Sequence, residues 1–534
     1  MWRLLSLVLL LRPAAAQLSG PVGPLTSYTS KAATKVCNII DYGGYPNNGT
    51  DIGPALLQAW DDCAKGGLVY IPPGNYSMAT FNELKDGVSS AVQLDGVINR
   101  TGSIGSTMLS FRNCADFEFF SGNSKGAIQG NGYEYLANDD YGPRLMRFQD
   151  MGNFSVHGFA LVDSPSYYLT LDTVDSGEIY NIIMRGPTVL GGTDAIDVWG
   201  QNMWIHDIEA TNGDECVTVK NPSTNMLIES IFCNLSGGMS IGSLSTNTNI
   251  SSIYYRHIYA NDADPCFIKY HGGNGTVKDI VWDTVTVHGG AYPLSIDGAW
   301  GDKSEGNGVE ITNLTFKNWV GYNTEHSRPS IRILCSSEVP CTNIDLEEVY
   351  MFSEGEYATY ECENAFGNGA CLNSTASATS SGGYTAVQTV TSVATYTTSW
   401  MTNEFTSALL ANSSFTIPPV PTSFYPGETP YSSLLYLTGP GGLMTANSSS
   451  YGISSVAASS QQSSSSSLAP IATASSVQAV QTGIPAFSKP KDPMNGSCRQ
   501  QGDLPEMPEV RVHPELPDPK HRSHLEHHLK NKHH

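Results

Sequence analysis

Residues 203–210, Met-Trp-Ile-His-Asp-Ile-Glu-Ala, form one unit of a repeat that decides the fold. The apolar pair in this unit, Ile205/Ile208, has counterparts at Val156/Phe159, Ile179/Ile182 and Ile228/Ile231. The first members of successive pairs are 23, 26 and 23 residues apart, and the series continues at longer steps with Ile253, Ile280, Ile311 and Ile344. A strand this short cannot bury its apolar face alone, so stacked units must share one core. The repeat therefore predicts an all-β fold, a single-stranded right-handed parallel β-helix, which is a solenoid.

Other β folds fit this pattern less well. A sandwich or an antiparallel barrel would need hairpin turns every ~8–12 residues, and a βαβ barrel would need helices between its strands. The one convincing amphipathic helix is Pro54–Cys63, which we expect to cap the open end of the first coil. We expect residues 67–76 to supply the first strand and turn of the solenoid.

Composition and the N-terminal segment indicate a secreted protein. Only 15% of the 534 residues are charged and the formal net charge is −22, which argues against a nucleic-acid partner because phosphate binding needs clustered Lys and Arg. An acidic surface is common in an acid medium, but solubility explains it equally well. Residues 1–16 have the basic start, short apolar run and small-residue end of a signal peptide. No later segment is long enough to span a bilayer. We expect an extracellular monomer without a membrane partner.

Cysteine and glycosylation signals agree with this location. Four close pairs among the 11 cysteines are expected to form disulfides in an oxidising compartment, namely Cys37 with Cys63, Cys216 with Cys233, Cys335 with Cys341, and Cys362 with Cys371. Asn-x-Ser/Thr acceptors predict a hydrated, N-glycosylated surface at Asn48, Asn75, Asn99, Asn153, Asn234, Asn249, Asn274, Asn313, Asn373, Asn412, Asn447 and Asn495.

The chain changes character after Cys371. From Ser374 to about Gly483 only Glu404 and Glu428 are charged, and Ser, Thr, Ala and Tyr dominate. We expect a β-helix over residues 17–374 and an extended flank along it over residues 375–445. A disordered Ser/Thr-rich linker over residues 446–490 and a His/Lys-rich tail over residues 491–534 are expected to follow.

Carboxylates concentrate in the middle of the repeat, at Asp194, Asp197, Asp214 and Glu215. Glycoside hydrolysis needs one carboxylic acid to protonate the leaving oxygen and one carboxylate to activate water or attack carbon. Adjacent residues on a regular strand face opposite sides, so Asp214 and Glu215 can share a substrate only if Gly213 permits a turn or bulge. Crowding would then raise the pKa of at least one carboxyl.

Two other readings of these carboxylates stay open on spacing alone. Asp after Gly or Asn often only closes a turn, and four carboxylates could ligate calcium. Lys269, on a later unit, favours a negatively charged sugar over a metal ion. We therefore expect no cofactor and no metal.

The order of these motifs resembles glycoside hydrolase family 28, the pectin-cleaving β-helices, over roughly residues 18–374. The motifs are Thr193-Asp194 with Asp197, Asp214-Glu215, Gly238-Met239-Ser240-Ile241-Gly242-Ser243 and Ile268-Lys269. The resemblance implies that Asp214 is the general acid and that Asp194 with Glu215 holds the attacking water. It also implies that Lys269 binds a galacturonate carboxylate.

Two departures bear on the substrate. Polygalacturonases of this family have Gly-His-Gly where this chain has Ser236-Gly237-Gly238, and Arg-Ile-Lys where it has Phe267-Ile268-Lys269. An arginine pairs well with a uronic carboxylate, whereas phenylalanine suits the methyl group of rhamnose. The chain thus resembles the fungal rhamnogalacturonases, which implies inverting endo-hydrolysis of α-D-galacturonosyl-(1,2)-α-L-rhamnosyl linkages in the backbone of rhamnogalacturonan I.

Competing functions are a polygalacturonase, a pectate lyase and a carbohydrate-binding β-helix without catalysis. A lyase would need calcium and an arginine base, and Phe267 removes the obvious candidate. In place of the missing histidine at position 237, we expect His288, with His271 as the alternative, to orient the acid. Asp197, Phe267 and Tyr292 complete the expected substrate-binding set with Lys269, and Tyr270 and Trp300 are further candidates for stacking on sugars.

Overall fold

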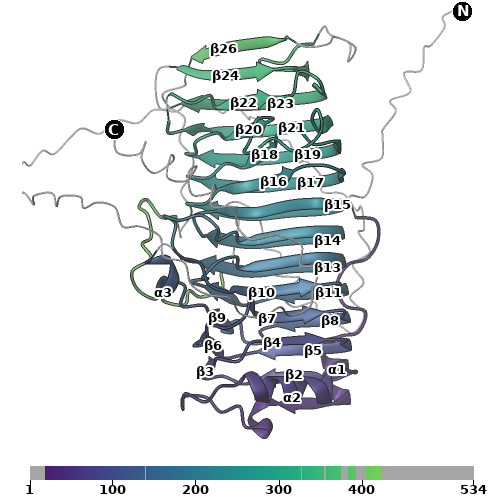
Figure 1. The fold of residues 1–534 in the computed structure, drawn as a ribbon, viewed down its shortest axis with the longest axis vertical. Helices are drawn as coiled ribbons and strands as arrows, with labels where there is room; N and C mark the ends of the chain where they lie inside the picture. Colours follow the sequence, from purple (N-terminus) through teal and green to yellow (C-terminus); the bar gives the residue numbers. More distant parts are fainter. Residues whose placement is uncertain are drawn as a thin grey trace, which may run out of the picture. The chain divides into compact units, whose positions relative to one another are not determined.

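The computed structural model describes residues 18–138, 140–325, 327–353, 357–374, 383–391, 401 and 404–422. Within these residues β-strands dominate and stack coil on coil along one axis (Figure 1). Nearly all strand pairs are parallel, and each strand pairs with the strand about one repeat later in the sequence. The predicted parallel β-helix is confirmed.

The helices are α1 (Tyr28–Thr34), α2 (Gly53–Cys63), α3 (Tyr133–Leu136) and the 3-10 helix η1 (Ile39–Tyr42). The strands up to the site are β1 (Val36–Asn38), β2 (Leu68–Ile71), β3 (Asn75–Met78), β4 (Asn82–Lys85), β5 (Val88–Leu94), β6 (Val97–Arg100), β7 (Thr107–Arg112), β8 (Ala115–Phe120), β9 (Ala127–Gln129), β10 (Arg144–Gln149), β11 (Gly152–His157), β12 (Ala160–Val162), β13 (Leu169–Arg185) and β14 (Ile196–Thr211). The later strands are β15 (Glu215–Asn234), β16 (Gly238–Leu244), β17 (Thr248–Asn261), β18 (Cys266–Tyr270), β19 (Gly275–His288), β20 (Leu294–Asp297), β21 (Glu310–Asn323), β22 (Ile331–Leu334), β23 (Cys341–Ser353), β24 (Tyr357–Glu363), β25 (Ala365–Asn368) and β26 (Thr385–Thr391).

The core consists of columns of apolar side chains, one from each coil. Ile179, Ile205 and Ile228 align in β13, β14 and β15, as the repeat predicts. The column continues through the aromatic rings of Tyr255, Trp282 and Phe316, which stack at centroid distances of 4.6 Å and 4.9 Å. Burial of these side chains from coil to coil supplies the stabilisation that a single coil lacks.

The predicted continuation of the isoleucine series is wrong in its register. Ile253 aligns with Met226 rather than with Ile228, and Ile311 aligns with Val277 in a third column. Each strand carries several apolar residues two or three positions apart, such as Ile250, Ile253 and Tyr255 in β17, so sequence steps do not separate one column from its neighbour.

The N-terminal end of the β-helix is covered by a helix, as predicted. Helix α2 packs on β1, β2 and β4, and its Leu56 and Trp60 are buried. The first strand, however, is β1 rather than the expected strand at Leu68–Ile71. β1 has only three residues, too few for a recognisable pattern, and a disulfide from Cys37 to Cys63 ties it to α2.

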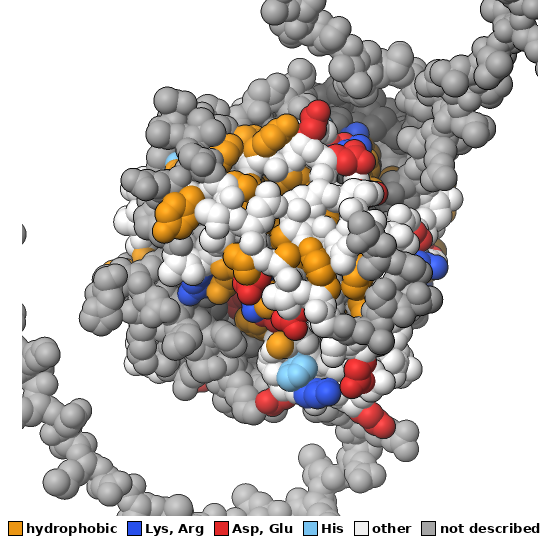
Figure 2. Space-filling model, turned by 90° about the horizontal axis from the view of Figure 1, so that it is seen from above, with side chains coloured by type: hydrophobic (Ala, Val, Ile, Leu, Met, Phe, Trp, Pro, Cys, Tyr) orange, Lys and Arg blue, Asp and Glu red, His pale blue; other side chains and the backbone are white. Residues whose placement is uncertain are grey.

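The other end is closed by an antiparallel strand. β26 pairs antiparallel with β24, from Tyr357 with Thr391 to Glu363 with Thr385. Figure 2 looks onto this end and shows apolar side chains dispersed among polar ones, with charged side chains mainly toward the rim. On this side of the β-helix the parallel stacking of the coils therefore ends at β24, while β25 still pairs parallel with β23.

The flank after the β-helix contacts the outer side of several coils. The Nδ2 group of Asn261 donates to the Phe405 carbonyl (3.1 Å), and Leu409 exchanges hydrogen bonds with Thr188. Further along, Gln129 donates to the Phe415 carbonyl over 2.8 Å. Phe415, with the nearby Ile417 and Val420, packs against an apolar cluster of β9, β12 and β13. Residues 404–422 therefore form a strap along the coils.

The four predicted disulfides are present, joining Cys37 to Cys63, Cys216 to Cys233, Cys335 to Cys341 and Cys362 to Cys371. Among the described residues Cys114 and Cys266 are free and buried. No helix in this part of the chain is long and apolar enough to cross a membrane.

One predicted glycosylation site is wrong. Asn234 is fully buried, and its Nδ2 group donates to Thr211 Oγ1 over 2.9 Å, so the folded chain has no room for a glycan on that nitrogen. The predicted signal peptide, linker and tail, with acceptors Asn447 and Asn495, lie outside the described residues.

Candidate active site

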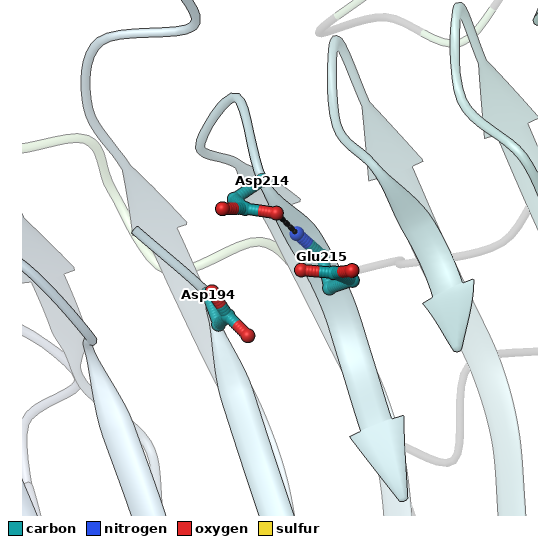
Figure 3. A group of neighbouring side chains, drawn as sticks. All are labelled: Asp194, Asp214 and Glu215. Carbon is teal, nitrogen blue, oxygen red and sulfur yellow. Dashed lines mark hydrogen bonds between the residues drawn. The ribbon is translucent and has the colours of Figure 1, made fainter. Parts of the chain in front are cut away.

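Three carboxylates meet at the start of two neighbouring strands. Asp194 precedes β14, while Asp214 and Glu215 lie at the start of β15, one coil later. One oxygen from each carboxylate lies within 4.8 Å of the others, and all three residues are buried. Figure 3 shows the side chains gathered around one space. The structure thus brings together the three residues expected to carry the chemistry.

The turn before β15 lets Asp214 and its neighbour Glu215 serve the same space. Gly213 has φ +85°, which side-chain-bearing residues rarely adopt, and a Cβ there would meet the backbone of the preceding loop at 2.8 Å. Asn212 donates to the carbonyls of Thr193 (2.8 Å) and Glu215 (2.9 Å). These bonds fasten the turn to the preceding coil, next to Asp194.

Gly237 occupies the position where polygalacturonases have histidine, and it packs on the peptide that joins Asp214 to Glu215. Its N–H donates to the Asp214 carbonyl over 2.7 Å, and a Cβ on it would lie 3.0 Å from the Glu215 nitrogen. Any side chain here would press on that peptide. The backbone of residue 237, rather than a histidine, therefore supports the two carboxylates.

The proton and the charge are shared unevenly within the cluster. Burial raises the pKa of Asp194 well above its ordinary value, and the charges of Asp197 and Asp214 raise it further. Asp214, by contrast, accepts the N–H of Glu215 over 2.9 Å and the N–H of Gly192. Burial and the neighbouring charges therefore favour the protonated form of Asp194.

Two lysines face the carboxylates. Lys269 of β18 forms an ion pair with Glu215, and Lys220 of β15 lies 3.4 Å from Asp197 and 4.0 Å from Asp194. Burial lowers the pKa of Lys269, and the nearby carboxylates only partly oppose it. Burial also acts to lower the pKa of Lys220, but the carboxylates outweigh it and the pKa is raised. Lys220 therefore stays charged beside Asp197.

Aromatic rings line the side of the site toward the later coils. The Nζ atom of Lys269 lies 5.5 Å from the ring centroids of both Phe267 and Trp300. The two rings meet edge to face at 4.9 Å. Phe267 and Trp300 thus form an apolar wall around the charged group.

Tyr292 lies beyond this wall, in contact with two cations. The guanidinium groups of Arg328 and Arg332 lie 4.8 Å and 5.1 Å from its ring centroid. Its N–H donates to Asp264, whose pKa is raised to about 6 by burial. Two guanidinium groups therefore already engage the ring, and stacking of a sugar on Tyr292 stays a prediction.

His288 is not brought to the carboxylates. It ends a chain of side-chain hydrogen bonds that starts at Thr211, just before Asp214, and passes through Asn234 and Asn261. Three coil steps of about 4.8 Å place it roughly 14 Å from Thr211 along the axis. There its Nδ1 lies against Glu404 of the strap. The alternative, His271, bonds the Gly301 carbonyl over 2.9 Å.

Sequence reasoning missed several residues of the site. Tyr167 lies near the cluster, and burial together with the charges of Asp194, Asp197 and Asp214 raises its pKa. Arg144 lies 4.9 Å from its ring centroid. Both precede the quoted motifs, and no motif marks them. Lys220 could have been found, since it continues the alternation of outward positions after the buried Val217 and Val219.

A cation could in principle occupy the three carboxylates. Calcium takes six to eight oxygen ligands, however, and the ion pairs of Lys269 with Glu215 and of Lys220 with Asp194 already place positive charge there. The donor set therefore suits acid–base chemistry better than metal binding.

Comparison with known proteins identifies the family. The family model described as "Glycosyl hydrolases family 28" matches residues 74–372. A "Probable rhamnogalacturonase C" of Aspergillus niger is 59% identical over 435 residues, which are 81% of this chain and 95% of that protein. A "Rhamnogalacturonase A" of Aspergillus aculeatus is 47% identical over 426 residues, 79% of this chain and 96% of that protein.

Solved structures share the fold at lower identity. Endo-xylogalacturonan hydrolase from Aspergillus tubingensis superposes with a TM-score of 0.55 at 20% identity, covering 60% of this chain and 93% of that chain. A polygalacturonase from Erwinia carotovora ssp. carotovora gives a TM-score of 0.50 at 18% identity, covering 62% and 95%. These two support the fold alone. The family match and the two relatives show that this chain belongs to glycosyl hydrolase family 28.

Proposed function

We propose that this protein is a secreted endo-hydrolase of the rhamnogalacturonan I backbone, which cleaves α-D-galacturonosyl-(1,2)-α-L-rhamnosyl linkages with inversion. The relatives named rhamnogalacturonase, at 59% and 47% identity over most of their length, support the substrate. The observation that carries the proposal is the cluster of Asp194, Asp214 and Glu215 next to Lys269. It combines carboxylates for acid–base catalysis with a cation for a uronate.

In the proposed reaction Asp214 protonates the leaving oxygen of rhamnose, while Asp194 and Glu215 hold and deprotonate the attacking water. Because burial favours the protonated form of Asp194, the proposed reaction includes a proton transfer from Asp194 to Asp214 when substrate binds. Their carboxylate oxygens lie within 4.8 Å, close enough for direct transfer or transfer through one water. Asp194 is then ionised and ready to act as the base.

The stereochemistry depends on the spacing of the carboxylates. Retaining enzymes have carboxyl groups roughly 5–5.5 Å apart and inverting enzymes roughly 6.5–9.5 Å apart. The closest oxygens here, within 4.8 Å, are nearer to the first class. Inversion is proposed because two carboxylates on neighbouring coils, Asp194 and Glu215, are available for one water, which matches the roles implied by the family motifs.

The wall of Phe267 and Trp300 supports the proposed preference for a rhamnose next to the uronate on Lys269. Beside the uronate-binding Lys269 it offers an apolar surface for the methyl group of a 6-deoxy sugar.

Secretion and glycosylation are part of the proposal. The four disulfides fit an oxidising compartment. The acceptors with exposed side chains in the described residues are Asn48, Asn75, Asn249, Asn274, Asn313 and Asn412, and those of Asn99, Asn153 and Asn373 are half-buried. Mass spectrometry of the secreted protein before and after endoglycosidase treatment tests this, and unmodified exposed acceptors would contradict it.

The central test compares purified rhamnogalacturonan I with homogalacturonan, each with and without a chelator. We expect oligomers with rhamnose at the new non-reducing end from the first polymer, little product from the second, and no effect of chelator. Proton NMR in the first minutes should show the β anomer of the new galacturonate end. Equal or faster cleavage of homogalacturonan would reject the substrate, and an initial α anomer would reject inversion.

A further inference from the structure

One ladder of paired residues runs through the site, with one residue from each coil. Neighbouring strands pair its members in register, and it consists of Ser110, Arg147, Thr170, Asp197, Thr218, Ser240, Phe267, Ser295, Arg332 and Glu361. We call each member with the residues beside it a rung, and consecutive rungs are about 4.8 Å apart. A pyranose residue in an extended polysaccharide spans about one rung.

From the catalytic carboxylates toward the later strands, cations stand on every second rung. Lys220 is on the rung of Thr218, Lys269 is on the rung of Phe267 two steps later, and Arg332 is two steps after that. The step is therefore about 10 Å. Toward the earlier strands, the first cation of the ladder is Arg147, which lies three rungs before Thr218. The spacing of two rungs between cations is therefore found only toward the later strands of the described ladder.

The rungs between these cations are neutral or acidic. Ser240 and Ser295 occupy them, and within the described residues their buried hydroxyl groups have no hydrogen-bond partner. The rung of Ser295 also carries Asp297, which pairs in register with Lys269. A polymer with a carboxylate on every sugar would therefore place one of them against the Asp297 carboxylate, which is unfavourable.

Arg332 is built to hold a carboxylate at the last of these cationic rungs. Its Nη1 donates to Asp297 over 2.7 Å, and its guanidinium lies on the Tyr292 ring at 5.1 Å. These contacts fix the plane of a group that has five N–H donors. Its side chain keeps 20% of its surface exposed.

We infer that Lys220, Lys269 and Arg332 form a row of uronate subsites with a two-rung step, which measures the alternation of charged and neutral sugars. Arg332 forms the new subsite. Asp297 disfavours a uronate on the rung between Lys269 and Arg332. This inference rests on the proposed function, because the alternating backbone of rhamnogalacturonan I is the polymer whose charges repeat at every second sugar.

The first test measures KM and kcat of Arg332→Gln on rhamnogalacturonan oligosaccharides of increasing length. We expect KM to rise on the order of tenfold, with kcat unchanged, for oligosaccharides long enough to reach the Arg332 rung. Shorter ones that end at the Lys269 rung should be cleaved as by wild type. Arg332→Lys should recover part of the loss. The control is Lys317→Gln, which removes an ion pair with Asp283 on another side of the β-helix.

The second test uses oligogalacturonate as a competitive inhibitor of rhamnogalacturonan cleavage. Asp297→Asn keeps the shape of the side chain and removes its charge, so oligogalacturonate should inhibit this variant several-fold more strongly than wild type. An Arg332→Gln effect that is the same for short and long oligosaccharides, or an unchanged inhibition constant in Asp297→Asn, would overturn the inference. A wild-type protein that leaves rhamnogalacturonan intact would instead overturn the proposed function.

Discussion

The contribution of Asp163 to the stability of the fold should be lost between about pH 4 and pH 7. Asp163 is fully buried after β12, and one of its carboxylate oxygens accepts a long bond of 3.4 Å from the Tyr133 N–H. The other oxygen has no hydrogen-bond partner within the described residues. Burial raises the pKa of Asp163 to about 7.

The magnitude follows from this shift. An aspartate in an unfolded chain titrates near 3.9, so the difference is roughly 3 units, or about 4 kcal/mol. Because the folded pKa is the higher one, the folded protein binds more protons than the unfolded chain in this range. The contribution to stability is fully present below about pH 4 and is lost as the pH rises through about 7. Asp163→Asn cannot ionise and should lack this loss.

The measurement is unfolding by guanidinium chloride with the disulfides intact, followed by circular dichroism at pH 4, 5.5 and 7.5. The free energy of unfolding of Asp163→Asn, relative to wild type, should rise by up to about 4 kcal/mol from pH 4 to pH 7.5. Asp264→Asn should show a smaller rise, because burial raises that pKa to about 6. Asp41→Asn, at an exposed carboxylate, is the control. A difference between Asp163→Asn and wild type that does not change with pH would refute the reasoning.

Three further outcomes are expected. Asp214→Asn should lower kcat roughly 10²–10⁴-fold while substrate still binds, and retained turnover would move the acid role to another carboxylate. Lys269→Gln should raise KM and lower kcat together, because it removes a uronate contact and leaves Glu215 without its ion pair. Kinetics on rhamnogalacturonan measure both constants, and a change in KM alone would contradict the proposed role. Glu404→Gln should cost about 1–3 kcal/mol of stability, because it weakens the contacts of the strap with His288 and Tyr259. Proteolysis of residues 404–422 should become faster, and an unchanged rate would contradict this.

The fold could be predicted from sequence because it repeats. The steps between Ile179, Ile205 and Ile228 match the period of one coil, and a stack of short strands has few alternatives. The same reasoning lost the register at Ile253, where apolar residues lie only two or three positions apart and two columns look alike. It also missed β1, which is too short to show any period.

The site residues that lie in short sequence motifs could be predicted. Asp214, Glu215 and Asp194 stand one coil apart beside glycines, and the structure brings them together. The prediction that His288 orients the acid relied on its position about one coil beyond Lys269 in the sequence. Sequence distance gives the coil but not the side of the β-helix on which a residue lies. Its partner Glu404 comes from the strap, more than a hundred residues later, and no local pattern reveals such a contact.

The strand that closes the last coil has a consequence for how copies of the protein behave in a crowded solution. A stack of parallel strands is a template onto which another stack could add end to end, as in the growth of a filament. At one end α2 lies where a preceding coil would bind, and at the other β26 runs against the direction that a following coil would need. Both ends of the β-helix are therefore covered in a way that opposes end-to-end addition of a second copy.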